Sequence, residues 1–259
     1  MKRYILSIAV GILLTLALGH HSLHAQDDKL NQFSFEDIPA EETKPAYFAI
    51  SGGFTATWLF TRLDDINTLT SSALGGAVYS SPLVLLGGEA FAAIGIIPNV
   101  RVGIMSIGGT NVLRNSASGM QLERQAEYSI SITGACFDYA WTPLKGFSII
   151  PGIRAGGGFI NYEISQSLGA TQSYPIFPII SASNAMRRMR ANMLFVMPNL
   201  NLEYAFTLVS MVRVNVGYNL SFVQDWRVDN LATLSNVSPA INATGLTAQV
   251  GLFVGLFNN

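Results

Sequence analysis

The sequence has a single cysteine, Cys136, and only three histidines, at positions 20, 21 and 24. One cysteine excludes an intramolecular disulfide and a cysteine metal cluster, and its small and apolar neighbours indicate a buried, unreactive thiol. If the first 25 residues are removed as a signal, no imidazole remains to act as a general base or a metal ligand. We therefore expect no metal, no cofactor and no histidine-dependent catalysis.

Charge and long apolar runs are also scarce. Only 12% of the 259 residues are charged, the net charge is -1 and the mean hydropathy is +0.36. Even so, no run after residue 25 reaches the roughly 18 apolar residues that a membrane helix needs. A chain that is apolar on average but lacks apolar blocks is typical of a barrel membrane protein, in which every second residue faces lipid. We expect no nucleic-acid partner.

Residues 1–25 have the parts of a secretory signal peptide. Lys2 and Arg3 form a basic start, residues 4–19 are uncharged and largely apolar, and the small residue Ala25 suits cleavage. The apolar run is short for the alternative, a membrane anchor. The sequence therefore predicts export and removal of this segment.

Residues 26–45 are polar and acidic and show neither helical nor strand periodicity. We interpret them as a flexible periplasmic lead-in. The alternative is a docking peptide built on Phe33, Phe35 and Ile38. Residues 46–257 form the remaining domain.

The clearest pattern in that domain lies in residues 192–226. Two stretches, at 196–206 and 212–222, alternate apolar with polar residues, and only residues 207–210 separate the two strands they predict. A period of two places alternate side chains on opposite faces of a strand, and so short a connection makes a hairpin turn. Strands of about a dozen residues suit a tilted crossing of a bilayer. The stretch predicts a transmembrane β-hairpin.

The same alternation occurs elsewhere, and the whole domain predicts eight strands. These are residues 47–61, 85–97, 100–107, 122–141, 147–165, 192–206, 211–224 and 245–257. The phase of the alternation changes near Gly134, which we interpret as a β-bulge, and again near Gly156-Gly157-Gly158.

Long and short connections alternate along this chain of strands. The long ones are residues 62–81, 108–121, 166–191 and 225–244, and the short ones lie near residues 98–99, 142–146 and 207–210. Short periplasmic turns with longer outer loops are typical of outer-membrane barrels. The predicted fold is therefore all-β, an eight-stranded antiparallel up-and-down transmembrane β-barrel with four long extracellular loops.

With these features the chain resembles the small eight-stranded bacterial outer-membrane barrels of the OmpA/OmpX type. The resemblance covers residues 47–257 and lies in the architecture. That class typically ends on an aromatic residue read by the barrel assembly machinery, and here Phe257 precedes Asn258 and Asn259. The resemblance implies location in the outer membrane, with outer-membrane lipid and the assembly machinery as partners. A further candidate partner is an extracellular ligand contacted through the outer loops.

Charged residues occur at the positions of the predicted strands that face the inside of the barrel. The predicted luminal charge network comprises Glu89, Arg101, Glu127, Arg154, Glu203 and Arg213. An eight-stranded barrel is just wide enough for side chains to fill it, and charges there must pair. We predict that Glu203 contacts both Arg154 and Arg213, with the other three as a second layer. A structural polar plug is the interpretation we favour, and a gated ion path is the alternative.

Three basic residues, Arg187, Arg188 and Arg190, cluster where the third long loop meets the sixth strand. Their guanidinium groups are suited to bidentate contacts with lipid phosphates, and a solvated loop edge is the alternative. The same loop contains the apolar stretch Tyr174–Ile180. We expect this stretch to pack over the barrel mouth rather than to form an exposed contact site.

Three classes of function fit these features. They are a sealed structural or surface-interaction barrel, a narrow channel or transporter for small solutes, and a membrane-embedded enzyme. The enzyme is disfavoured because the barrel hydrolases depend on a histidine, and a carrier of fatty ligands because the inward residues are polar. A soluble ligand-binding barrel is disfavoured by the long apolar outer faces. We favour the sealed barrel, with the channel gated by luminal charges as the alternative.

Overall fold

The structure is a computed structural model that describes residues 47–116, 122–168 and 185–258. The predicted signal peptide, the acidic lead-in at 26–45 and the apolar stretch at 174–180 lie outside the described residues.

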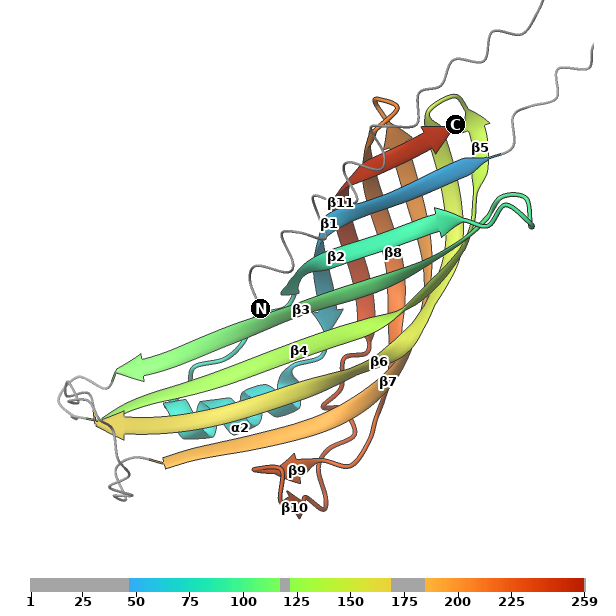
Figure 1. Ribbon diagram of the computed structural model, residues 1–259. Helices are drawn as coiled ribbons and strands as arrows, with labels where there is room; N and C mark the ends of the chain where they lie inside the picture. Colours follow the sequence, from blue (N-terminus) through green and yellow to red (C-terminus); the bar gives the residue numbers. More distant parts are fainter. Residues whose placement is uncertain (1–46, 117–121, 169–184, 259) are drawn as a thin grey trace, which may run out of the picture. The chain divides into compact units, whose positions relative to one another are not determined.

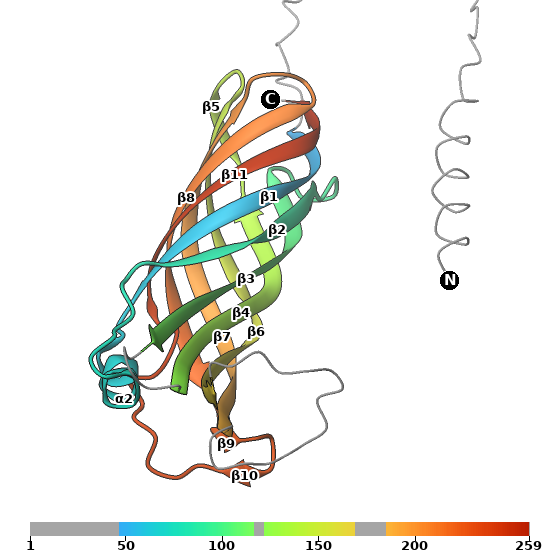
Figure 2. The same ribbon diagram turned by 90° about the vertical axis from the view of Figure 1, so that its left-hand side faces the viewer.

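Eight antiparallel strands close into a barrel (Figures 1 and 2). They are β1 (Phe48–Thr61), β2 (Leu83–Ala93), β3 (Val100–Ser116), β4 (Leu122–Tyr139), β6 (Phe147–Leu168), β7 (Ala185–Ala205), β8 (Ser210–Val223) and β11 (Gly245–Asn258). Each pairs with its neighbours in chain order, and β1 pairs with β11 along its whole length, which closes the sheet. The predicted eight-stranded antiparallel barrel is confirmed.

Short and long connections separate to opposite ends of the barrel (Figure 1). One end carries the turns between β2 and β3, β4 and β6, and β7 and β8, together with the short strand β5 (Trp141–Leu144). The other end carries α2 (Asp64–Leu74), β9 (Arg227–Val228) and β10 (Ala232–Thr233). Short turns mark the periplasmic end of an outer-membrane barrel, so the opposite end is extracellular.

The outer surface of the barrel carries a band of exposed apolar side chains. On β8 these are Val212, Val214, Val216, Tyr218, Leu220 and Phe222, each 39–60% exposed, and β11 continues the band. Alternate residues on the same strands are buried, as a period of two requires. So large an exposed apolar surface is stable only against lipid.

The helix α2 corrects the prediction that residues 62–81 form a loop without secondary structure. Asp64 and Asp65 occupy the first turn, where the helix dipole favours acidic residues. Gly75 ends the helix in the left-handed conformation with a φ of 67°. Ile66 and Leu74 are buried on one face, and this stripe was hidden among small polar residues. No described helix is long and apolar enough to cross a membrane.

The predicted bulge near Gly134 is wrong, because the register of β4 with β3 and β6 continues unbroken through that residue. Even-numbered residues of β4 point inward along the strand, from Tyr128 to Asp138. What changes is the environment. In the outer half the apolar side chains face a packed interior and the polar ones face solvent, whereas in the periplasmic half the apolar ones face lipid. The same holds for β6, whose register continues through its glycines.

Gly134 has a packing role rather than a role in a bulge. A Cβ atom there would collide with the carbonyl oxygen of Ala155 and with the ring of Phe195. The glycine therefore allows the Phe195 ring to lie close to the β4 backbone.

Four strands extend well past the others at the extracellular end (Figure 1). β3, β4, β6 and β7 have 17, 18, 22 and 21 residues, whereas β1, β2, β8 and β11 have 11 to 14. Within the predicted loop at 108–121, β3 therefore continues to Ser116, and within the predicted loop at 166–191, residues 166–168 and 185–191 belong to β6 and β7. We call the outer parts of these four strands the extracellular sheet. Its inward face packs on α2 through Tyr162, whose hydroxyl lies 2.9 Å from Oγ1 of Thr70.

Candidate functional site

Charged side chains from six strands meet inside the periplasmic half of the barrel. In order of contact they are Asp138, Arg101, Glu203, Arg213, Glu89 and Arg154, an unbroken alternation of acid and base. Each of these side chains is at most 1% exposed. We call this set the luminal charge chain. Three acids balance three bases, so the buried cluster is neutral, which is the condition for keeping charges in a dry interior.

Glu203 is the best-paired residue of the chain. Arg101 donates to it in a bidentate arrangement, with Nη1 2.9 Å from Oε2 and Nη2 2.7 Å from Oε1. Nε of Arg213 donates to the same Oε1 over 2.6 Å. Charge-assisted hydrogen bonds of this kind, one of them bidentate, are about twice as strong as neutral ones.

The remaining links extend the chain to both sides. Nε of Arg101 lies 2.9 Å from Oδ2 of Asp138. Arg213 also contacts Glu89, whose second oxygen lies 3.0 Å from Nη2 of Arg154. Strands on opposite sides of the barrel are thus joined through their side chains at this level.

The predicted contact between Arg154 and Glu203 is not formed. In the β6–β7 register Glu203 lies opposite Ser148, six residues from Arg154, which is about 20 Å along a strand. Both residues point inward as predicted, but at different depths. Arg101 and Arg213, not Arg154 and Arg213, flank Glu203.

Glu127 is not part of the chain. It lies on the face of β4 opposite to the buried Tyr128, in the half of the strand where polar side chains face outward. Asp138 supplies the third acid, and our prediction missed it. A signal existed, because Asp138 lies between the outward-facing Phe137 and Tyr139. Gly152 stands opposite Asp138, and a Cβ there would overlap its carboxylate, so the glycine makes room for the acid.

Aromatic rings close the lumen on the periplasmic side of the charge chain. The guanidinium of Arg101 lies 4.1 Å from the centre of the Phe91 ring, and that of Arg213 lies 4.1 Å from the Phe253 ring. Phe91 and Phe253 pack with Phe257 in one buried cluster. These cation–π contacts add to the stabilisation of the two arginines by the acids.

Amide side chains continue the network toward the extracellular side. Asn215 donates to Oδ1 of Asn201 over 2.7 Å and to Oδ1 of Asn199 over 3.0 Å. Arg154 donates to Gln249 over 3.2 Å. This amide layer lies next to the charge chain, and Arg154 contacts it through Gln249. Its side chains hydrogen-bond to one another inside the lumen.

The outer half of the lumen is apolar, which corrects our expectation that the inward residues are polar throughout. Met105, Ile107, Ile132, Met193, Phe195 and Met197 are each at most 3% exposed and belong to one cluster. The cluster continues outward to Tyr128 and Tyr79, whose rings pack with centres 5.9 Å apart. Burial raises the pKa of the Tyr79 hydroxyl. The described lumen thus contains four layers of buried side chains. From the periplasmic side outward they are aromatic, charged, amide and apolar.

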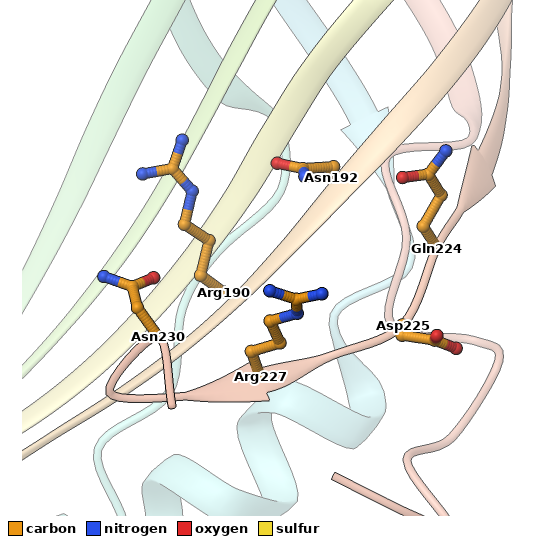
Figure 3. Close-up of a pocket in the computed structure, with 6 residues that line it drawn as sticks. All are labelled: Arg190, Asn192, Gln224, Asp225, Arg227 and Asn230. Carbon is orange, nitrogen blue, oxygen red and sulfur yellow. The ribbon is translucent and has the colours of Figure 1, made fainter. Parts of the chain in front are cut away.

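The three arginines of the predicted lipid-phosphate cluster have different environments. Arg188 forms an ion pair with Glu163 over 2.7 Å. Arg187 lies on the opposite face of β7 by alternation. Arg190 packs over the ring of Phe159 at 4.2 Å and lines an open pocket (Figure 3). The second arginine of that pocket, Arg227, was missed because it lies in a predicted loop that forms β9.

A closed eight-stranded barrel with an apolar outer band and a neutral luminal charge chain defines the class: a small β-barrel protein of the bacterial outer membrane. No protein-family model and no curated protein matches the sequence. Among the described residues no group of three or more histidine, cysteine, aspartate or glutamate side chains is placed to hold a metal ion.

Solved structures of outer-membrane proteins resemble the chain at low identity. Ail, the attachment invasion locus protein of Yersinia pestis, is 9% identical over 82% of this chain and 99% of its own, with a TM-score of 0.36. A major outer membrane protein from Thermus thermophilus is 9% identical over 81% and 99%, with a TM-score of 0.42. The outer membrane protease OmpT from Escherichia coli is 11% identical over 83% and 98%, with a TM-score of 0.30. Similarity at this level assigns no activity.

Proposed function

We propose that this barrel binds a partner at the cell surface through its extracellular sheet and outer connections, while its lumen stays closed. The observation that supports this function is the extension of β3, β4, β6 and β7 beyond the lipid-facing band. A barrel that only spans the membrane has no need of strands this long. Apolar packing under the sheet, including Ile66 and Leu74 of α2, holds it as an ordered surface.

The extracellular sheet has an edge suited to strand addition. The last β2–β3 pair joins Leu86 to Gly108, and beyond it residues 109–116 of β3 pair only with β4. An unpaired strand edge offers backbone donors and acceptors to an extended peptide. The outward face beside it is polar, for example at Arg114, whose Nε donates to Gln125 over 3.0 Å. These features favour a polypeptide partner.

The alternative, a channel gated by the luminal charges, is less well supported. Opening a path would require breaking the ion pairs of Glu203 and also displacing the apolar layer around Phe195. Residues 47–258 contain no histidine, so histidine-dependent catalysis forms no part of the proposed function.

Site-specific photocrosslinking on intact cells tests the surface role. A photoreactive phenylalanine analogue at Val112, on the β3 edge and 44% exposed, is expected to form an adduct with an external polypeptide. The control is Val250 in the lipid-facing band of β11, which is 41% exposed. An adduct at Val112 and none at Val250 supports the proposal. Absence of adducts both at Val112 and at Leu231, on the connection after β8, would contradict it.

A further inference from the structure

A polar pocket of about 620 Å³ lies on the outer surface where β7 meets β9 (Figure 3). It is lined by Arg190, Asn192, Gln224, Asp225, Arg227 and Asn230. We propose that this pocket binds the phosphate group of a lipid headgroup in the outer leaflet, between the guanidinium groups of Arg190 and Arg227. The proposal goes beyond the surface-interaction role, because it concerns a lipid at the membrane boundary and not a polypeptide partner.

The pocket begins where the lipid-facing band ends. Leu194 and Phe222 stand opposite each other on β7 and β8 and are 56% and 60% exposed. The next outward-facing position on β7 is Asn192, and its carbonyl oxygen accepts a hydrogen bond from the backbone N–H of Gln224 over 2.8 Å. Two residues of a strand span about 7 Å. The surface therefore changes from apolar to polar within the depth of a headgroup layer.

Two arginines of like charge line this pocket. Arg190 and Arg227 are register partners in the β7–β9 pair, so their side chains leave the sheet on the same face. Like charges directly opposite each other destabilise a strand pair. Neither arginine forms an ion pair with any described residue, and Asp225, which lines the same pocket, pairs with neither. An anion between the two guanidinium groups removes this repulsion.

The Arg190 side chain and the backbone that carries Arg227 are held in place without a ligand. The ring of Phe159 supports the guanidinium of Arg190 at 4.2 Å. β9 is fixed beside β7 because the backbone N–H of Asp229 donates to the carbonyl of Arg188 over 2.9 Å, and Oδ1 of Asp229 accepts from the N–H of Arg188 over 3.1 Å. Preorganised guanidinium groups match the oxygens of a phosphate. The amides of Asn192, Gln224 and Asn230 add donors at the rim (Figure 3).

Lipid binding to the full chain folded in neutral maltoside micelles tests the proposal. The probes are dioleoyl phosphatidic acid, dioleoylglycerol with the same acyl chains but no phosphate, and inorganic phosphate. We expect the phosphatidic acid to bind, and both Arg190→Gln and Arg227→Gln to weaken its binding by about tenfold each. The matched control is Arg188→Gln on the same face of β7, where Glu163 already neutralises the charge. It should change binding by less than about twofold.

Arg227→Glu gives a readout that a merely structural arginine would not. It turns the like pair into an opposite pair, so without ligand the melting temperature should rise while phosphatidic acid binding is lost. Unchanged binding in Arg227→Gln, or equal binding of dioleoylglycerol, would overturn the site. Competition by inorganic phosphate at the concentration of the lipid would show that the ligand is a free anion and would overturn the lipid assignment.

Discussion

Glu203→Ala is expected to lower the free energy of unfolding of the barrel by about 3–5 kcal/mol. The substitution removes the acid shared by Arg101 and Arg213 and leaves two buried guanidinium groups facing each other. Asp138 and Glu89 remain, but each already holds one of these arginines. The loss is therefore the cost of uncompensated buried charge rather than of one contact.

Urea unfolding of the folded barrel in lipid vesicles, followed by tryptophan fluorescence, measures this effect. The matched control is Glu163→Ala, which breaks the ion pair with Arg188, whose side chain is 44% exposed. The control should cost less than about 1 kcal/mol. Equal, small effects in the two variants would mean that the luminal arginines are hydrated and that the charge chain does not fill the bore.

Phe195→Ala should lower the free energy of unfolding by about 3–5 kcal/mol, for a different reason. Phe195 is 1% exposed in the apolar layer above the charges, and its ring lies over Gly134, so its removal leaves a cavity that the rigid strands cannot close. Leu194→Ala is the control, since Leu194 is the adjacent residue and faces lipid with 56% exposure. The same urea titration applies. A larger loss for Leu194 than for Phe195 would show that the two faces of β7 are assigned the wrong way round.

The barrel could be predicted because a period of two is a local property of the sequence. Val212 to Phe222 on β8 and Leu246 to Leu256 on β11 read directly as one lipid-facing surface. The prediction failed where the apolar face of a strand changes from the lipid side to the interior of the barrel. On β4 the pattern around Tyr128 and Ile130 marks a buried core under α2, and no local signal distinguishes that from lipid contact. In the sequence, a change of environment therefore gives the same pattern as a bulge.

The members of the luminal charge chain were more predictable than their contacts. Glu203 and Arg213 are register partners on neighbouring strands, and the same is true of Arg101 and Asp138. The link from Arg101 to Glu203 instead crosses the barrel, and so depends on the depth of each residue along its tilted strand. The alternation of a strand shows which residues face inward, but not how deep in the barrel each of them lies. For the same reason Arg227 could not be paired with Arg190 before β9 was known.

Planar-bilayer conductance of the refolded full chain tests most directly whether the lumen is closed. With the bore filled by the charge chain and by the apolar layer around Phe195, the wild-type protein should show no steady conductance across a wide range of voltage. Glu203→Ala, where it folds, should show intermittent leaks, because the bore loses its central acid. A stable, large conductance in the wild-type protein would contradict the sealed lumen and favour the gated channel.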